Sequence, residues 1–68
     1  MSKTSSERML YRATVLVRQN GGPNGAVQQF EAIVLVLMRE YSTTRQVAKG
    51  AVQQAIRDER WRIMRAKA

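Results

Sequence analysis

The last twelve residues of the chain gather the side chains best suited to binding an anionic partner. They contain five cations with a tryptophan in their midst: Arg57, Arg60, Trp61, Arg62, Arg65 and Lys67. A guanidinium binds phosphate or carboxylate through paired hydrogen bonds, and an aromatic ring can stack on a nucleic-acid base. Arg45 and Lys49 extend the positive surface along the preceding sequence. These eight residues form the candidate nucleic-acid-binding site, although Trp61 is equally compatible with a place at the end of the core.

Catalytic chemistry has little to work with in this sequence, which has no His and no Cys. General acid–base catalysis would depend on carboxylates, Lys or Tyr, and a zinc site would lack both of its preferred ligand types. Asp58 and Glu59 are the only adjacent acids, and neighbours on a helix point in different directions. The glycines of residues 21–25 match neither phosphate-binding glycine fingerprint. We therefore predict a protein that is not an enzyme, with no catalytic residue, metal, cofactor or small-molecule substrate.

The charge balance predicts the sign of the partner's charge. Twelve Lys and Arg residues, nine of them Arg, stand against five Asp and Glu residues, which gives a net charge of +7. A compact domain with this balance attracts nucleic acid or an acidic protein surface. The alternative is a basic surface that only keeps the protein in solution. Residues 1–7 lack the apolar core of a signal peptide, and the apolar run 32–38 is too short to span a bilayer. We expect a cytoplasmic protein without a membrane partner.

The length of 68 residues allows one domain, close to the lower limit for a self-sufficient core. Polar residues 1–8 are expected to form a flexible tail, and residues 9–68 the single small domain. Disulfides cannot form without Cys, and small domains that lack such cross-links are often stabilised by a partner subunit. A homodimer is therefore expected.

Two segments rich in β-branched residues flank a turn. Residues 11–19 alternate apolar and polar side chains, and residues 26–39 contain the run Ile33–Leu37. Asn, Gly and Pro between them, at 20–25, favour chain reversal. This pattern predicts a β-hairpin, and the alternation over 61–66 predicts a short third strand. With the helix described next, the sequence predicts a small α+β fold.

An amphipathic helix is predicted over residues 43–59. Its apolar residues recur at spacings of three and four: Val47, Ala48, Ala51, Val52, Ala55 and Ile56. Thr43 and Gln46 suit a capping box at its start. Gly50 lies inside it, at a cost of up to about 1 kcal/mol relative to Ala. Residues 25–29 and 50–54 share the sequence Gly-Ala-Val-Gln-Gln, but two copies do not make a repeat architecture.

The hairpin would leave one of its faces uncovered. That face carries four large aliphatic side chains, Leu16, Ile33, Leu35 and Leu37. Soluble monomers avoid exposed apolar patches of this kind, and burying each side chain contributes roughly 1.5–3 kcal/mol. We therefore predict that these four residues form the dimer or partner interface.

An all-helical bundle is the alternative fold. Residues 4–7 fit a capping box, and two helical stripes can be drawn: Met9, Ala13, Leu16 and Val17, and Phe30, Val34, Leu37 and Tyr41. A second alternative comes from residues 12–17 followed by the helix start at 42–47, which resembles the ribbon-helix-helix repressors. The resemblance implies a dimer whose strand, with Arg12, Thr14 and Leu16, enters the DNA major groove. The stretch between strand and second helix is longer than that pattern expects.

Two hypotheses for function follow. The first is a small homodimeric nucleic-acid-binding or regulatory protein that uses the basic C-terminal surface. The second is a protein-binding inhibitor or adaptor, of the compact kind carried by phages and mobile elements. It would dock on a host protein through the aliphatic sheet face.

Overall fold

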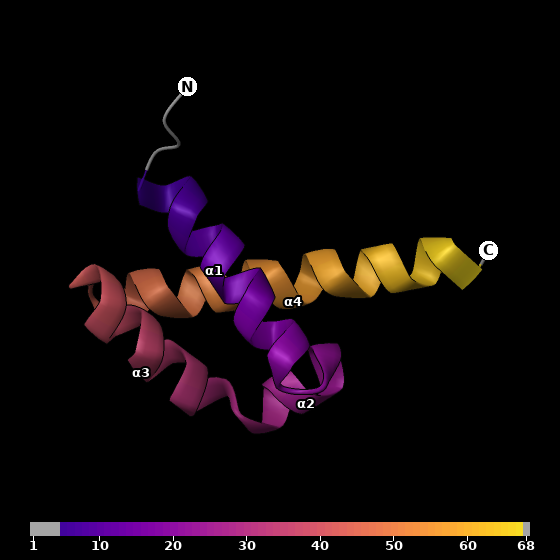
Figure 1. Cartoon of the computed structure of the whole chain (residues 1–68), viewed down its shortest axis with the longest axis horizontal. Helices are drawn as coiled ribbons and strands as arrows, with labels where there is room; N and C mark the ends of the chain where they lie inside the picture. Colours follow the sequence, from indigo (N-terminus) through magenta and orange to yellow (C-terminus); the bar gives the residue numbers. More distant parts are fainter. Residues whose placement is uncertain (1–4, 68) are drawn as a thin grey trace.

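The computed structural model describes residues 5–67. These residues form four helices joined by short turns. They are α1 (Ser5–Gln19), α2 (Gly22–Gln28), α3 (Phe30–Tyr41) and α4 (Arg45–Lys67). Helices α1 and α3 both lie against the long helix α4, and the short helix α2 joins their ends (Figure 1). The most extensive packing is between α1 and α4.

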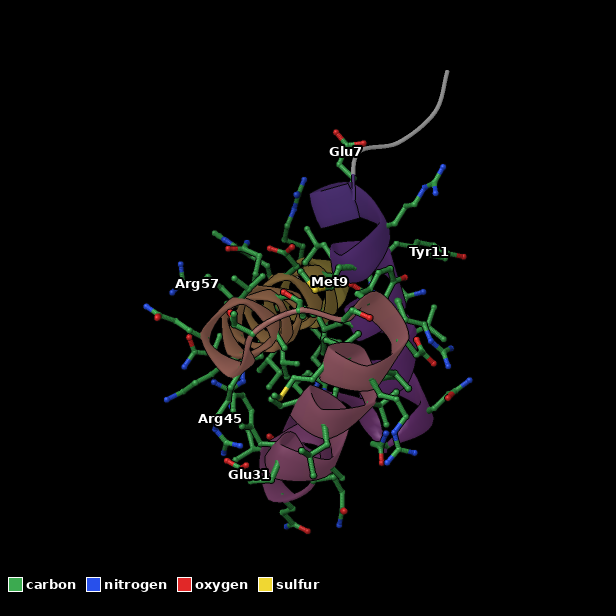
Figure 2. The ribbon with its side chains drawn as sticks, turned by 90° about the vertical axis from the view of Figure 1, so that its left-hand side faces the viewer. Glu7, Met9, Tyr11, Glu31, Arg45 and Arg57 are labelled. Atoms are coloured by element: carbon green, nitrogen blue, oxygen red, sulfur yellow. The ribbon has the colours of Figure 1, made fainter. Side chains whose placement is uncertain are left out.

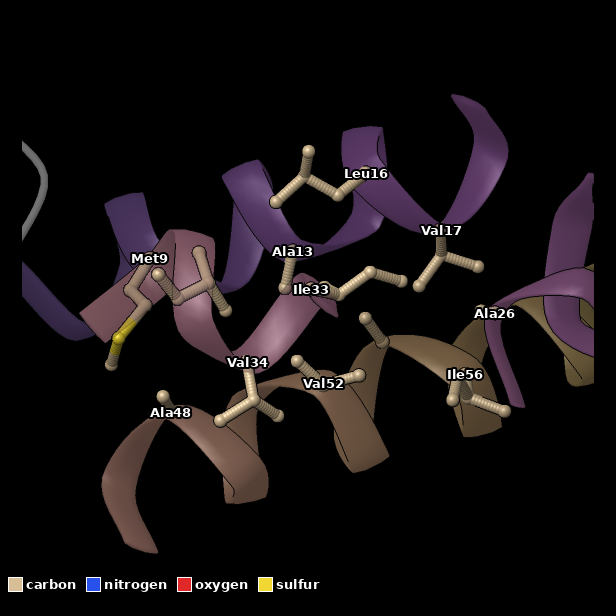
Figure 3. Close-up of a cluster of buried hydrophobic side chains, with 12 residues drawn as sticks. Met9, Ala13, Leu16, Val17, Ala26, Ile33, Val34, Ala48, Val52 and Ile56 are labelled. Atoms are coloured by element: carbon tan, nitrogen blue, oxygen red, sulfur yellow. The ribbon is translucent and has the colours of Figure 1, made fainter. Parts of the chain in front are cut away.

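The core lies where the apolar stripes of α1, α3 and α4 meet (Figure 3). Its buried members are Met9, Ala13, Leu16 and Val17 of α1, Ala26 of α2, Ile33, Val34 and Leu37 of α3, and Ala48, Val52, Ala55 and Ile56 of α4. Within each long helix the buried residues recur mainly at spacings of three and four, which places them on one side of the helix. The two helical stripes of the all-α alternative thus supply much of this core.

The predicted α+β fold is wrong. Residues 11–19 belong to α1, residues 26–39 span parts of α2 and α3, and residues 61–66 continue α4; no strand occurs anywhere in 5–67. Both apolar segments also carry helical stripes, and burial of those stripes against α4 outweighs the modest β preference of Val and Ile. The ribbon-helix-helix alternative fails for the same reason, because residues 12–17 are helical.

The turn at residues 20–25, predicted to join two strands, reverses the chain between helices α1 and α2. Gly21 and Gly22 both adopt positive φ, 92° and 80°, and the Asn20 side-chain amide donates a 2.7 Å hydrogen bond to the Leu16 carbonyl. These contacts end α1 in a left-handed glycine cap, and Pro23 suits the first turn of α2 because its missing N–H is not needed there. The residue types that favour a hairpin turn therefore serve equally well between helices.

Helix α4 is longer than the predicted helix 43–59. Thr44, not Thr43, provides the cap, because its Oγ1 accepts a 3.3 Å hydrogen bond from the Val47 N–H. The helix then continues to Lys67, through the segment predicted as a third strand. Of the predicted flexible tail, residues 5–8 form the first turn of α1, and residues 1–4 lie outside the described residues.

The predicted aliphatic interface does not exist as a surface. Leu16, Ile33 and Leu37 are buried in the core, and only Leu35 is exposed. Alternate residues share one face of a strand, but on a helix they lie about 200° apart, so Leu35 points away from its two neighbours in the set. The homodimer was expected both from the small size of the chain and from this face; the support from the face is lost, and the homodimer stays a prediction.

Two variants distinguish the helical placement of Leu35 and Leu37 from the predicted strand. Leu37→Asp is expected to abolish cooperative folding, because it places a carboxylate among buried apolar side chains. Leu35→Asp is expected to shift the thermal midpoint by only a few degrees, because Leu35 is 54% exposed. Far-ultraviolet circular dichroism on heating measures both. Similar losses in the two variants would contradict the helical placement of this segment.

Candidate nucleic-acid interface

The end of α4 extends beyond the rest of the bundle. Glu59 is the last buried residue of the helix, and from Arg60 to Lys67 every residue is exposed except the half-buried Ile63. Figure 1 shows this end of α4 running past α1 and α2. A partner can therefore reach the last two helical turns from several sides.

All eight predicted binding residues lie on α4 and are exposed. The structure groups them unequally: Arg57, Arg60, Trp61, Arg62 and Arg65 surround two neighbouring surface hollows near the end of the helix. Arg45 and Lys49 are near its start, and at 1.5 Å per residue Arg45 lies roughly 18 Å along the axis from Arg57. Arg45 and Arg57 project from the same side of the bundle, and Arg45 forms an ion pair with Glu31 (Figure 2).

The first hollow has a volume of about 610 Å³ and lies between α4 and the joint of α2 with α3. Its lining comprises Val27, Phe30, Gln53, Ile56, Arg57, Arg60, Trp61 and Met64. The floor is apolar, and the two guanidinium groups provide its positive charge. Sequence reasoning did not identify Val27 and Phe30, because only the folded positions of α2 and α3 bring them beside α4.

The second hollow, of about 470 Å³, is lined by Asp58, Trp61, Arg62 and Arg65. Trp61 lines both hollows, the first together with four apolar residues and the second together with three charged ones. The residue is 58% exposed. It therefore does not fill the end of the core, which was the structural alternative for this residue.

Ion pairs from two exposed arginines to one buried carboxylate secure α4 just before its exposed end. The Glu59 carboxylate is 3% exposed and accepts hydrogen bonds from Arg18 Nε at 2.6 Å and Arg62 Nε at 3.0 Å. Burial raises the pKa of Glu59, but the hydrogen bonds and charges of Arg62 and Arg18 outweigh burial and lower that pKa below its ordinary value. The carboxylate thus stays ionised, joins α4 to α1 and orients Arg62.

Two further acids pair with arginines away from the hollows, and Asp58 bonds to an amide. Arg12 pairs with Glu40 at 3.0 Å, Arg45 pairs with Glu31, and Asp58 accepts a hydrogen bond from Gln54. Arg57, Arg60 and Arg65 make no ion pair with any side chain described between residues 7 and 67. Arg8 and Arg39 also lack such an ion pair, but they lie apart on α1 and α3, whereas Arg57, Arg60 and Arg65 lie together at the hollows.

Other kinds of site receive no support from the described residues. No cluster of three or more Asp and Glu side chains among them could hold a metal ion. No helix within 5–67 is both long enough and apolar enough to cross a membrane. Comparison of the chain with protein-family models, curated proteins and solved structures gives no match.

Proposed function

We propose that the protein binds nucleic acid through the C-terminal half of α4. The observation that carries this proposal is the group of three arginines, Arg57, Arg60 and Arg65, left without acidic partners on an exposed helix end. Guanidinium groups bind phosphate oxygens in bidentate fashion, and a protruding helix can approach a nucleic-acid backbone without hindrance from the rest of the bundle. Lys67 adds a further cation at the tip, and Lys49 extends the positive surface toward the start of α4.

Salt dependence tests the proposal. Neutralising about three phosphates predicts a log–log slope of about −2.7 for a duplex and about −2.1 for a single strand, so that affinity falls roughly 40-fold or roughly 20-fold, respectively, between about 50 and 200 mM salt. Fluorescence anisotropy of labelled single-stranded and duplex oligonucleotides measures this directly. No binding to either at the lowest salt would overturn the proposal.

The contribution of α4 is tested by removing two charges at a time. Arg57→Ala with Arg60→Ala should weaken binding and make the salt slope shallower by about 1.8 for a duplex and about 1.4 for a single strand. The control is Arg8→Ala with Arg39→Ala, which removes the same charge from exposed positions on α1 and α3. The control should keep the original slope, because those residues lie outside both hollows. Equal effects of the two pairs would contradict a site on α4.

An acidic protein segment is the second candidate partner. The apolar floor of the first hollow, with Val27, Phe30 and Met64, favours it because an amphipathic helix could lay apolar side chains there. Such binding would depend on Val27 and Phe30 more than on salt, since apolar contacts are not screened.

A further inference from the structure

Trp61 separates two hollows that both contain arginines. Arg57 and Arg60 line the hollow on one side, and Arg62 and Arg65 line the hollow on the other. More than half of the residue is exposed, so a planar group can reach it without displacing core side chains. We propose that Trp61 is a stacking platform for unpaired bases, and that the nucleic acid bound is single-stranded. This inference rests on the proposed function.

The charges around the ring fit the backbone of such a strand. Arginines line the hollows on both sides of the ring, where their long side chains can reach toward the phosphates of a nucleotide stacked on Trp61. Arg62 is held by the buried Glu59 through its Nε and, at 2.9 Å, its Nη2. The Arg62 side chain therefore lines the second hollow in a fixed position. Arg57, Arg60 and Arg65 supply the cations that phosphates can neutralise.

A duplex does not use these features. Its bases already stack on one another, so Trp61 could meet a base face only by intercalation, which costs a few kcal/mol of unstacking. The faces of a single strand are open, and stacking on an aromatic ring tolerates any base. The site is therefore expected to prefer single strands with little sequence selectivity.

The two hollows also distinguish a base from other occupants. Three of the four residues that line the second hollow are charged, so an amphipathic helix with its apolar side chains in the first hollow would find only Trp61 and the arginine stems to contact in the second. A second copy of this chain would bring two sets of unneutralised arginines together, which is repulsive. A flat ring with a polar edge can stack on Trp61, and its phosphate can reach Arg57 and Arg60 in the first hollow or Arg65 in the second, where Asp58 is an opposing charge.

The intrinsic fluorescence of the protein tests the inference, because Trp61 is its single tryptophan. Oligothymidylate added at about 50 mM salt is expected to quench the emission, whereas a duplex with the same number of phosphates should leave it nearly unchanged. Trp61→Leu should weaken single-strand binding at least about fivefold with an unaltered salt slope, and Trp61→Phe should restore part of the loss. Tyr11→Leu, which changes another exposed aromatic residue, on α1, is the control and should bind as the parent protein does.

The other possible results distinguish failure of the stacking platform from failure of nucleic-acid binding as a whole. Unchanged affinity in Trp61→Leu, with single strands and duplexes bound equally, would overturn the stacking platform and leave nucleic-acid binding by α4 intact. Absence of binding to any oligonucleotide would overturn both proposals. Quenching by an acidic amphipathic peptide alone would do the same and would identify the protein partner as correct.

Discussion

Gly25→Ala is expected to destabilise the protein by about 3 kcal/mol or more, at the severe end of the cost of overpacking. A β-carbon at this position would lie 1.8 Å from the Asn20 carbonyl oxygen and 2.9 Å from its carbonyl carbon. Both are backbone atoms, so no side-chain rotation relieves the contact, and the joint between α1 and α2 must move. Because that joint holds Ala26 in the core and Val27 at the first hollow, the change should also disturb the binding site.

Gly50→Ala provides a control in the same local sequence, because Ala-Val-Gln-Gln follows both glycines. A β-carbon at Gly50 would meet no atom within 4 Å, and the residue is exposed within α4. Replacing this glycine should therefore stabilise the protein by up to about 1 kcal/mol through helix propensity. For a domain of this size, 1 kcal/mol corresponds to about 4–8 °C in the thermal midpoint. Circular dichroism on heating should give shifts of opposite sign, and shifts of the same sign would contradict the close packing of α2 on the end of α1.

The contrast between the two glycines explains why the fold was only partly predictable. Identical pentapeptides occupy a tight helical joint and an open helix surface, and only the packing of distant residues distinguishes them. The same ambiguity affected the apolar segments. Val15 and Val17 alternate as in a strand, yet Val17 also lies on a helical stripe with Met9 and Ala13, and the period alone does not choose. The helix in the last third of the chain was predictable because its stripe is long and its charged side is continuous.

The candidate site was predictable to the extent that it is local. The cations and Trp61 lie within a few turns of one helix, so the sequence placed them together even under the wrong fold. Val27 and Phe30 join them only because α2 and α3 pack beside α4, and Arg18 reaches Glu59 across 41 positions of the sequence. Within α4, Glu59 bonds to Arg62 at 3.0 Å, three residues further along the helix, where neighbouring side chains meet. The contact between Glu59 and Arg18 of α1 could be found only once the fold was known.

Replacing Arg18 and Arg62 together by Met is expected to reverse the sign of the pH dependence contributed by Glu59. In the parent protein the pKa of Glu59 is lowered on folding, so the unfolded chain binds the proton more tightly. The stability from this group is therefore complete above the unfolded pKa, near about 4.3, and is lost as the pH falls through the folded pKa. Without the two arginines, burial alone would act on the carboxyl and raise its pKa. The folded state would then bind the proton more tightly, and acid would stabilise the variant relative to neutral pH.

The loss of folding stability is expected to be larger when the two arginines are replaced than when Glu59 is replaced. An ionised Glu59 without its arginines should cost about 3 kcal/mol at neutral pH, because a buried charge is left unpaired. Glu59→Gln should cost only about 1 kcal/mol, because the Arg18 and Arg62 side chains are 56% and 59% exposed and remain hydrated. Urea unfolding between about pH 7 and pH 3 measures both variants against the parent protein. Glu40, whose pKa is lowered by its hydrogen bond with Arg12, titrates in all three proteins and cancels in the differences. If the double variant lost stability in acid in parallel with the parent protein, Glu59 would not be the buried carboxylate that joins α4 to α1.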